Sequence, residues 1–130
     1  MSARLSFSQT EFQDSLREHG FLSDLIEEAR PHFAHLHPQW FPQARSLNHE
    51  ALLAFHRRED AVIGRTAHDP ICLATRLMMR TLNSFQGAII LYERGMSAEG
   101  DTLARGVFEI AFWIGFLNKK TRDCSQHFPE

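Results

Sequence analysis

The sequence predicts an all-α protein, folded as an antiparallel four-helix bundle with a tight hairpin between its last two long helices. Apolar residues recur at steps of three and four along most of the chain, which is the helical period. The chain has only 7 glycines and 5 prolines, and no alternating pattern of the kind seen in β-strands persists. A length of 130 residues with 43% apolar residues supports one core. We therefore expect a single domain over residues 1–130.

The first helix is expected over residues 8–37, with a kink near Pro31. Ser8 and Glu11 have the spacing of a capping box, in which each residue binds the backbone amide of the other. Gly20 weakens the helix interior, whereas Pro31 lacks an amide proton and clashes with the preceding turn. The apolar stripe of this helix consists of Phe12, Leu16, Leu22, Ile26, Ala29, Phe33 and Leu36.

The second and third helices are expected over residues 45–65 and 70–94. A connector with two prolines precedes the second helix, because each proline removes a hydrogen-bond donor and extends its predecessor. Asp69 and Pro70 form a start signal for the third helix, with an N-cap acceptor followed by the residue best tolerated in the first turn. The second helix is expected to bury Leu47, Ala51, Ala54, Phe55 and Val62.

The fourth helix is expected over residues 97–119, with Ser97 as its cap. Only Gly95 and Met96 separate it from the third helix. Gly95 can end the third helix in the left-handed conformation that glycine adopts without strain. Such a short connection forces the two helices into an antiparallel hairpin.

The fourth helix is apolar around most of its circumference. One face carries Leu103, Ala104, Val107, Ala111 and Ile114, and the remaining circumference carries Phe108, Phe112, Trp113 and Phe116. A helix that is apolar around nearly all of its circumference must be buried on more than one side, whereas each helix of a simple bundle keeps one solvent-exposed face. We therefore expect the four aromatic residues to form an interface in a homodimer or with a helical protein partner. The alternative is that the first helix, bent at Pro31, wraps over them.

A polar layer is expected beside these aromatic residues. Arg105 and Glu109 lie four residues apart, and charges in apolar surroundings are costly unless they are paired. The hairpin brings the third helix alongside, with Gln86 near Arg105. The expected layer consists of Arg76, Arg80, Asn83, Arg105 and Glu109. It is either a structural salt-bridge cluster or a pocket for an anion or nucleotide, since guanidinium groups offer paired donors to phosphate.

Three segments resemble a bacterial all-helical domain family of unknown function: Thr75–Arg80, Ala88–Gly95 and Leu103–Ile110. In that family an arginine-rich long helix leads through a glycine-ended turn into a helix that bears R-x-x-x-E. The resemblance covers about residues 71–118. It implies a helical bundle without an assigned reaction.

A weaker similarity points to the HEPN superfamily of helical ribonucleases and nucleotide-binding proteins. Its signature is an arginine followed after four to six residues by a histidine. Arg122 with His127 matches it, as does Arg30 with His35 or His37. In such a site histidine moves the proton of the ribose 2′-hydroxyl while arginine holds the scissile phosphate. An HEPN-like ribonuclease or nucleotide-binding module is therefore the alternative function.

A metal-binding bundle is the second alternative. Imidazole and carboxylate groups bind zinc and iron, and a histidine cluster precedes the connector. The cluster consists of His32, His35 and His37. A second group, with His49, His56 and Asp60, lies opposite the apolar face of its helix, and we expect it to be solvated. We expect no metal and no cofactor.

Composition limits the remaining function classes. The net charge of −2 offers no general basic excess, so we do not expect nucleic acid as a partner. Cys72 and Cys124 suit a reducing compartment. The apolar, uncharged run Thr81–Tyr92 is too short to cross a membrane. We expect a cytoplasmic, non-enzymatic interaction or regulatory domain that acts through self-association or a partner helix.

Overall fold

A computed structural model of the chain describes residues 5–126, with side chains through residue 119, and this part contains helices and no strands. The predicted all-α class is therefore confirmed. No helix in the described part has the length and hydrophobicity of a membrane span. The elements are α1 (Gln9–His19), η1 (Gly20–Leu22), α2 (Asp24–Leu36), α3 (Trp40–His56), η2 (Glu59–Val62), α4 (Pro70–Glu93) and α5 (Ser97–Gln126).

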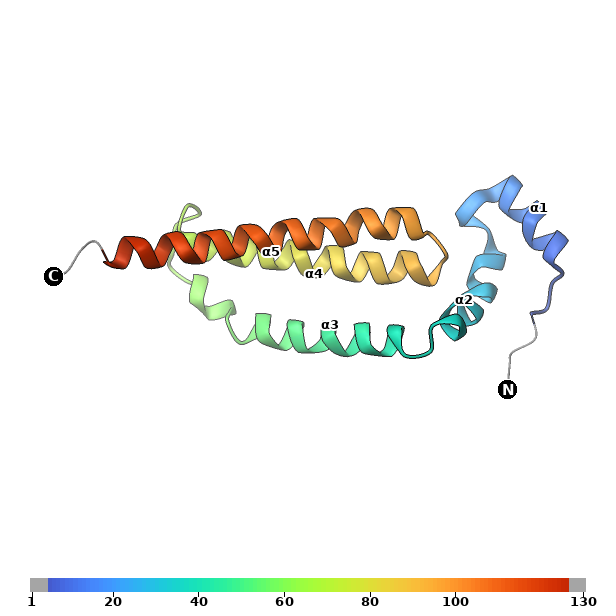
Figure 1. Cartoon of the computed structure of the whole chain (residues 1–130), viewed down its shortest axis with the longest axis horizontal. Coiled ribbons are helices and arrows are strands. Elements are labelled where there is room, and N and C mark those ends of the chain that lie inside the picture. Colours follow the sequence, from blue (N-terminus) through green and yellow to red (C-terminus); the bar gives the residue numbers. More distant parts are fainter. Residues whose placement is uncertain (1–4, 127–130) are drawn as a thin grey trace.

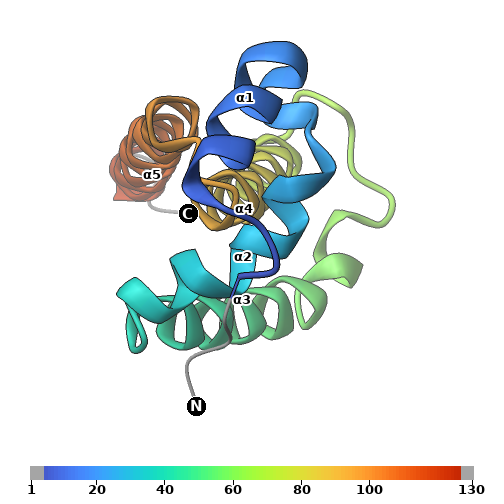
Figure 2. The same cartoon turned by 90° about the vertical axis from the view of Figure 1, so that its right-hand side faces the viewer.

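Three long helices form the body of the molecule (Figure 1). α4 lies in the middle, with its most extensive contact to α5 and a smaller contact to α3 (Figure 2). α1 and α2 lie at the end of this body, beside the turn between α4 and α5. The four-helix bundle is thus not confirmed, because the segment expected to run along the other helices crosses their end. α5 lies at the outside of the body with α4 as its main neighbour.

The N-terminal segment is broken at Gly20 and not at Pro31. Gly20 has φ +58°, a backbone conformation that only glycine adopts readily, and it ends α1. Ser23 then starts α2 as its N-cap, accepting a hydrogen bond of 3.2 Å from the amide of Leu25. Pro31 lies inside α2, which continues past it to Leu36. The expected single helix over residues 8–37 with a kink at Pro31 is therefore wrong. The break lies at Gly20, where one helix ends and Ser23 starts the next, and Pro31 does not interrupt the second helix.

α3 begins five residues earlier and ends nine residues earlier than predicted. Pro42 is the third residue of α3, in the first turn, where a missing amide leaves no intrahelical bond unmade. A short 3₁₀ turn, η2, replaces the end of the expected helix over residues 45–65. The buried face of α3 also differs from the predicted one. Phe41, Ala44 and Phe55 are buried, whereas Leu47, expected in the core, is 61% exposed.

Two predicted helix starts are confirmed by their hydrogen bonds. The amide of Glu11 donates to Ser8 Oγ at 3.2 Å, and the amide of Ser8 donates to Glu11 Oε2 at 2.7 Å. At the start of α4, the amide of Ile71 donates to Asp69 Oδ1 at 2.8 Å. These backbone bonds stabilise the ionised acids and lower the pKa of both Glu11 and Asp69.

The predicted hairpin between α4 and α5 is also confirmed. Gly95 has φ +79°, and its amide donates to the Tyr92 carbonyl oxygen at 3.0 Å. The amide of Met96 donates to the Leu91 carbonyl oxygen at 2.9 Å, which completes a Schellman motif. α5 starts at Ser97 and continues to Gln126, seven residues past the predicted end.

The core of the described part is small. A cluster of Phe41, Ala44 and Ile89 joins α3 to α4, and Ala34, Phe85 and Tyr92 pack against it. Within residues 5–119, ten apolar side chains are buried and sixteen large ones are exposed. Large apolar side chains are thus left in contact with water in unusual number. The buried ones are Ile26, Ala29, Phe41, Ala44, Phe55, Cys72, Leu82, Ala88, Ile89 and Ile110.

Candidate functional site

Four aromatic side chains on α5 form an exposed surface, called the aromatic face below: Phe108, Phe112, Trp113 and Phe116. Their exposed fractions are 76%, 75%, 57% and 52%, in that order. Trp113 and Phe116 touch edge to face, with ring centroids 6.1 Å apart. The expectation that the chain itself leaves these rings uncovered is confirmed. The alternative, in which the N-terminal helix wraps over them, is wrong, because α1 and α2 lie at the end of the body.

The aromatic face is exposed because α5 packs on α4 with its other side. Ile110 is buried there. A Cβ atom on Gly87 of α4 would lie only 2.9 Å from Leu103 of α5, so glycine permits the close approach of the two helices. Phe108 and Phe112 are two residues before and after Ile110, which rotates both to the far side of a helix with 3.6 residues per turn. α4 therefore cannot cover them.

The expected polar layer forms only in part. Arg105 Nε donates to Glu109 Oε1 at 2.9 Å, within the exposed surface of α5. Arg80 and Glu109 line one groove of about 560 Å³ between α4 and α5, together with Trp113. Arg76 and Asn83 are exposed and do not belong to the lining of this groove.

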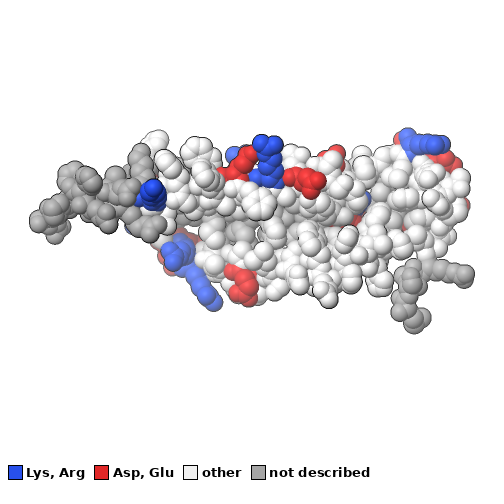
Figure 3. All heavy atoms as spheres, viewed as in Figure 1, with Lys and Arg blue, Asp and Glu red and all other residues white. Residues whose placement is uncertain are grey.

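One expected neighbour of this layer lies elsewhere. Gln86, expected near Arg105, faces α3, where its Nε2 donates to Asn48 Oδ1 at 3.0 Å. Gln86 therefore joins α4 to α3 and not to α5. On the face shown in Figure 3, charged side chains are scattered and do not gather into one patch.

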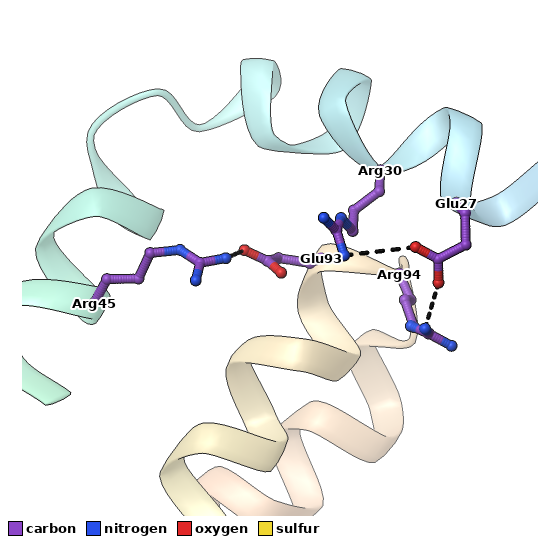
Figure 4. Close-up of polar contacts among 5 residues, drawn as sticks. All are labelled: Glu27, Arg30, Arg45, Glu93 and Arg94. Carbon is purple, nitrogen blue, oxygen red and sulfur yellow. Dashed lines mark hydrogen bonds and ion pairs between the residues drawn. The ribbon is translucent and has the colours of Figure 1, made fainter.

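A charged cluster without any sequence signal lies at the turn end of the hairpin (Figure 4). Glu93, at the end of α4, is 8% exposed and forms an ion pair with Arg45 of α3. Glu27 of α2 pairs with Arg94, next to the turn, and also with Arg30 at 3.5 Å. The five side chains thus join α2 and α3 to the end of α4.

This cluster positions the hairpin and does not by itself define a reaction. Glu93 is buried, and a buried carboxylate is costly unless a cation and hydrogen bonds compensate it. Phe33 of α2 packs close to the turn, since a Cβ atom on Gly95 would lie 3.4 Å from its ring. Ionic and apolar contacts therefore hold the N-terminal helices against the end from which α5 starts.

The residues of the HEPN-like motif are only partly described. His127 and the side chain of Arg122 lie outside the described residues. Arg30 and His35 both line a hollow of about 560 Å³ that also includes Glu93. Arg30 itself is directed to Glu27.

The histidines expected as alternative metal ligands do not converge. Within the described part of the chain, no three His, Cys, Asp or Glu side chains are close enough together to hold a metal ion. His32, His35 and His37 are exposed on or just after α2. His56, in the second histidine group, lies with Nδ1 2.6 Å from Glu59 Oε1 at the surface.

One comparison with known proteins finds a match, to a family without an assigned activity. A family model described as a family of unknown function (DUF5677) matches residues 72–128, which include α4 from its third residue and all of α5. The predicted resemblance to a helical family of unknown function is confirmed over these residues, whereas the HEPN similarity gains no support. No curated protein and no solved structure matches the chain. The family match therefore coincides with the hairpin that carries the aromatic face.

Proposed function

We propose that this chain is a non-enzymatic interaction domain that associates with a second copy of itself through the aromatic face of α5. The observation that supports the proposal most strongly is the exposure of Phe108 and Phe112, about three quarters of each ring side chain. Water contact with so much clustered aromatic surface is unfavourable, and such patches mark interaction sites. The arginine and glutamate on the same helix pair with each other and add no net charge to the surface.

The aromatic face supplies a large part of the area that a stable dimer needs. An aromatic side chain buries about 150–250 Å² when it is covered completely. With the exposed fractions given above, the aromatic face offers about 500 Å² per chain, or about 1,000 Å² for two copies. A standard interface buries about 1,200–2,000 Å² in total, and neighbouring backbone and side chains supply the remainder.

A dimer through α5 also buries this helix on both sides. Phe108 and Phe112 lie on the side of α5 away from α4, so the two α5 helices pair in the middle and one α4 lies on each outer side. In this arrangement the exposed side of α5 becomes the contact shared by the two copies.

The proposal is tested by the molar mass of the variant Phe112→Asp in light scattering after gel filtration. We expect wild type to have twice the chain mass of 15.0 kDa and the variant to have 15.0 kDa. Leu47→Asp is the matched control, because Leu47 is also a large exposed apolar residue but lies on α3. It should leave the mass at the dimer value. A Phe112→Asp variant that keeps both its helicity and the dimer mass contradicts the proposal.

A further inference from the structure

The outer side of α5 carries a heptad pattern whose two ends differ in charge. Six residues, called the seam below, follow one another at alternating steps of four and three, which is the spacing that lines one side of a helix in a coiled coil. Each is exposed, and Phe108 and Phe112 at its centre lie on the side of α5 away from α4, whereas Asp101 at its start also contacts Tyr92 of α4. The seam consists of Asp101, Arg105, Phe108, Phe112, Gly115 and Lys119.

We infer that two copies pair through antiparallel α5 helices, as a short coiled coil whose twofold axis passes near Ile110. The inference rests on the proposed self-association and adds its direction and register. In an antiparallel coiled coil, a residue at one seam position lies beside a residue of the other seam position in the second copy. With the axis near Ile110, Phe108 lies beside the second copy's Phe112, and the two phenylalanines of each chain fill the centre.

Charge supports the antiparallel direction. Asp101 lies near the start of α5 and Lys119 lies 18 residues further along the same side. The antiparallel register places Asp101 of each copy beside Lys119 of the other, so one pair of opposite charges lies at each end of the seam. Parallel helices place Asp101 beside Asp101 and Lys119 beside Lys119, and like charges in such positions repel. Asp101 also accepts a hydrogen bond from the Tyr92 hydroxyl of α4, and it stays exposed.

Side-chain size supports the same register. Arg105 lies beside the second copy's Gly115 in the antiparallel arrangement. A Cβ atom on Gly115 would meet nothing within 4 Å, so this position offers space for a long neighbour. Arg105 can then lie across the glycine and keep its bond to Glu109, which flanks the seam. A parallel pair would place arginine beside arginine and glycine beside glycine, with repulsion at one level and a void at the other.

Disulfide cross-linking distinguishes the two directions. Arg105→Cys and Gly115→Cys are each made in a chain that lacks the native cysteines (Cys72→Ala, Cys124→Ala), and neither change touches the two phenylalanines. We expect a cross-linked dimer when the two variants are mixed and oxidised, and little from either variant alone. Cross-linking of each variant with itself, and none between them, overturns the antiparallel register.

Charge reversal provides an independent test by sedimentation velocity over a concentration series. Asp101→Lys should raise the dissociation constant of the dimer about ten-fold, since two attractive pairs become repulsive. Adding Lys119→Asp should restore it to within about two-fold of wild type. Glu50→Lys, the same reversal on the exposed surface of α3, should leave it unchanged.

The outcomes separate the two proposals. A wild-type chain that stays monomeric at all concentrations contradicts the proposed function. A dimer that Lys119→Asp fails to restore, and whose cross-links join identical positions, contradicts only the antiparallel register.

Discussion

Two glycines of α5 should respond in opposite ways to the same substitution, because one faces α4 and the other faces open space. A Cβ atom on Gly100 would lie 3.0–3.2 Å from three ring atoms of Tyr92. This ring cannot move aside easily. It packs edge to face on Trp40, with centroids 5.4 Å apart, and its hydroxyl is bound to Asp101. A Cβ atom on Gly106 would meet nothing within 4 Å.

The magnitudes follow from two opposing effects. Replacing a helical glycine by alanine stabilises a helix by about 1 kcal/mol. Overpacking a filled contact costs about 1–3 kcal/mol. Gly106→Ala should therefore raise the free energy of unfolding by about 1 kcal/mol, whereas Gly100→Ala should lower it by about 1 kcal/mol. The difference between the two variants is then about 2 kcal/mol.

The measurement is urea unfolding followed by circular dichroism, at one protein concentration for all variants because association adds to stability. A Gly100→Ala variant as stable as Gly106→Ala would refute the close contact between Gly100 and Tyr92, and with it the packing of α5 on α4 near the turn.

Two further predictions concern the charged groups. Arg45→Met leaves the carboxylate of Glu93, whose side chain is 11% exposed, without its cation, and should lower the free energy of unfolding by about 1–3 kcal/mol. Adding Glu93→Leu should recover most of that loss; a double variant as unstable as the single one argues against the ion pair. Hydrogen bonds from the Ile71 amide and Arg65 hold the pKa of Asp69 below its ordinary value of 3.8. The cap therefore stabilises the fold fully above pH 3.8 and loses this contribution as the pH falls through the lower, folded-state pKa. Asp69→Ala should lower the thermal midpoint at pH 7, and a deficit that stays the same at pH 2 would contradict this linkage.

Local signals predicted the second half of the described fold well. Asp69 with Pro70, and Gly95 with its short turn, act over one helical turn, so their effect is visible in a few consecutive residues. The aromatic face was predicted from the helical period of 3.6 residues, because residues four apart lie on one side of a helix. The exposed rings are therefore a property of α5 that needs no knowledge of the other helices.

The first half of the fold depended on competition between local signals. Glycine and proline can each interrupt a helix, so Gly20 and Pro31 were both candidates for the break. The break occurs at Gly20, because Ser23 can cap a new helix directly after it. Pro42 was expected to precede its helix, although the first turn tolerates it. The pair of Arg45 and Glu93 is separated by 48 residues, so only the packing of α3 on α4 reveals it. A contact between residues of two different helices leaves no pattern in the sequence of either helix.

The mass of the wild-type chain in solution tests the central claim most directly. Sedimentation equilibrium at micromolar concentration should give about 30 kDa, twice the chain mass of 15.0 kDa, because the phenylalanines of α5 need a second copy to cover them. A mass of 15.0 kDa that does not rise with protein concentration would contradict the claim that this face of α5 joins two copies.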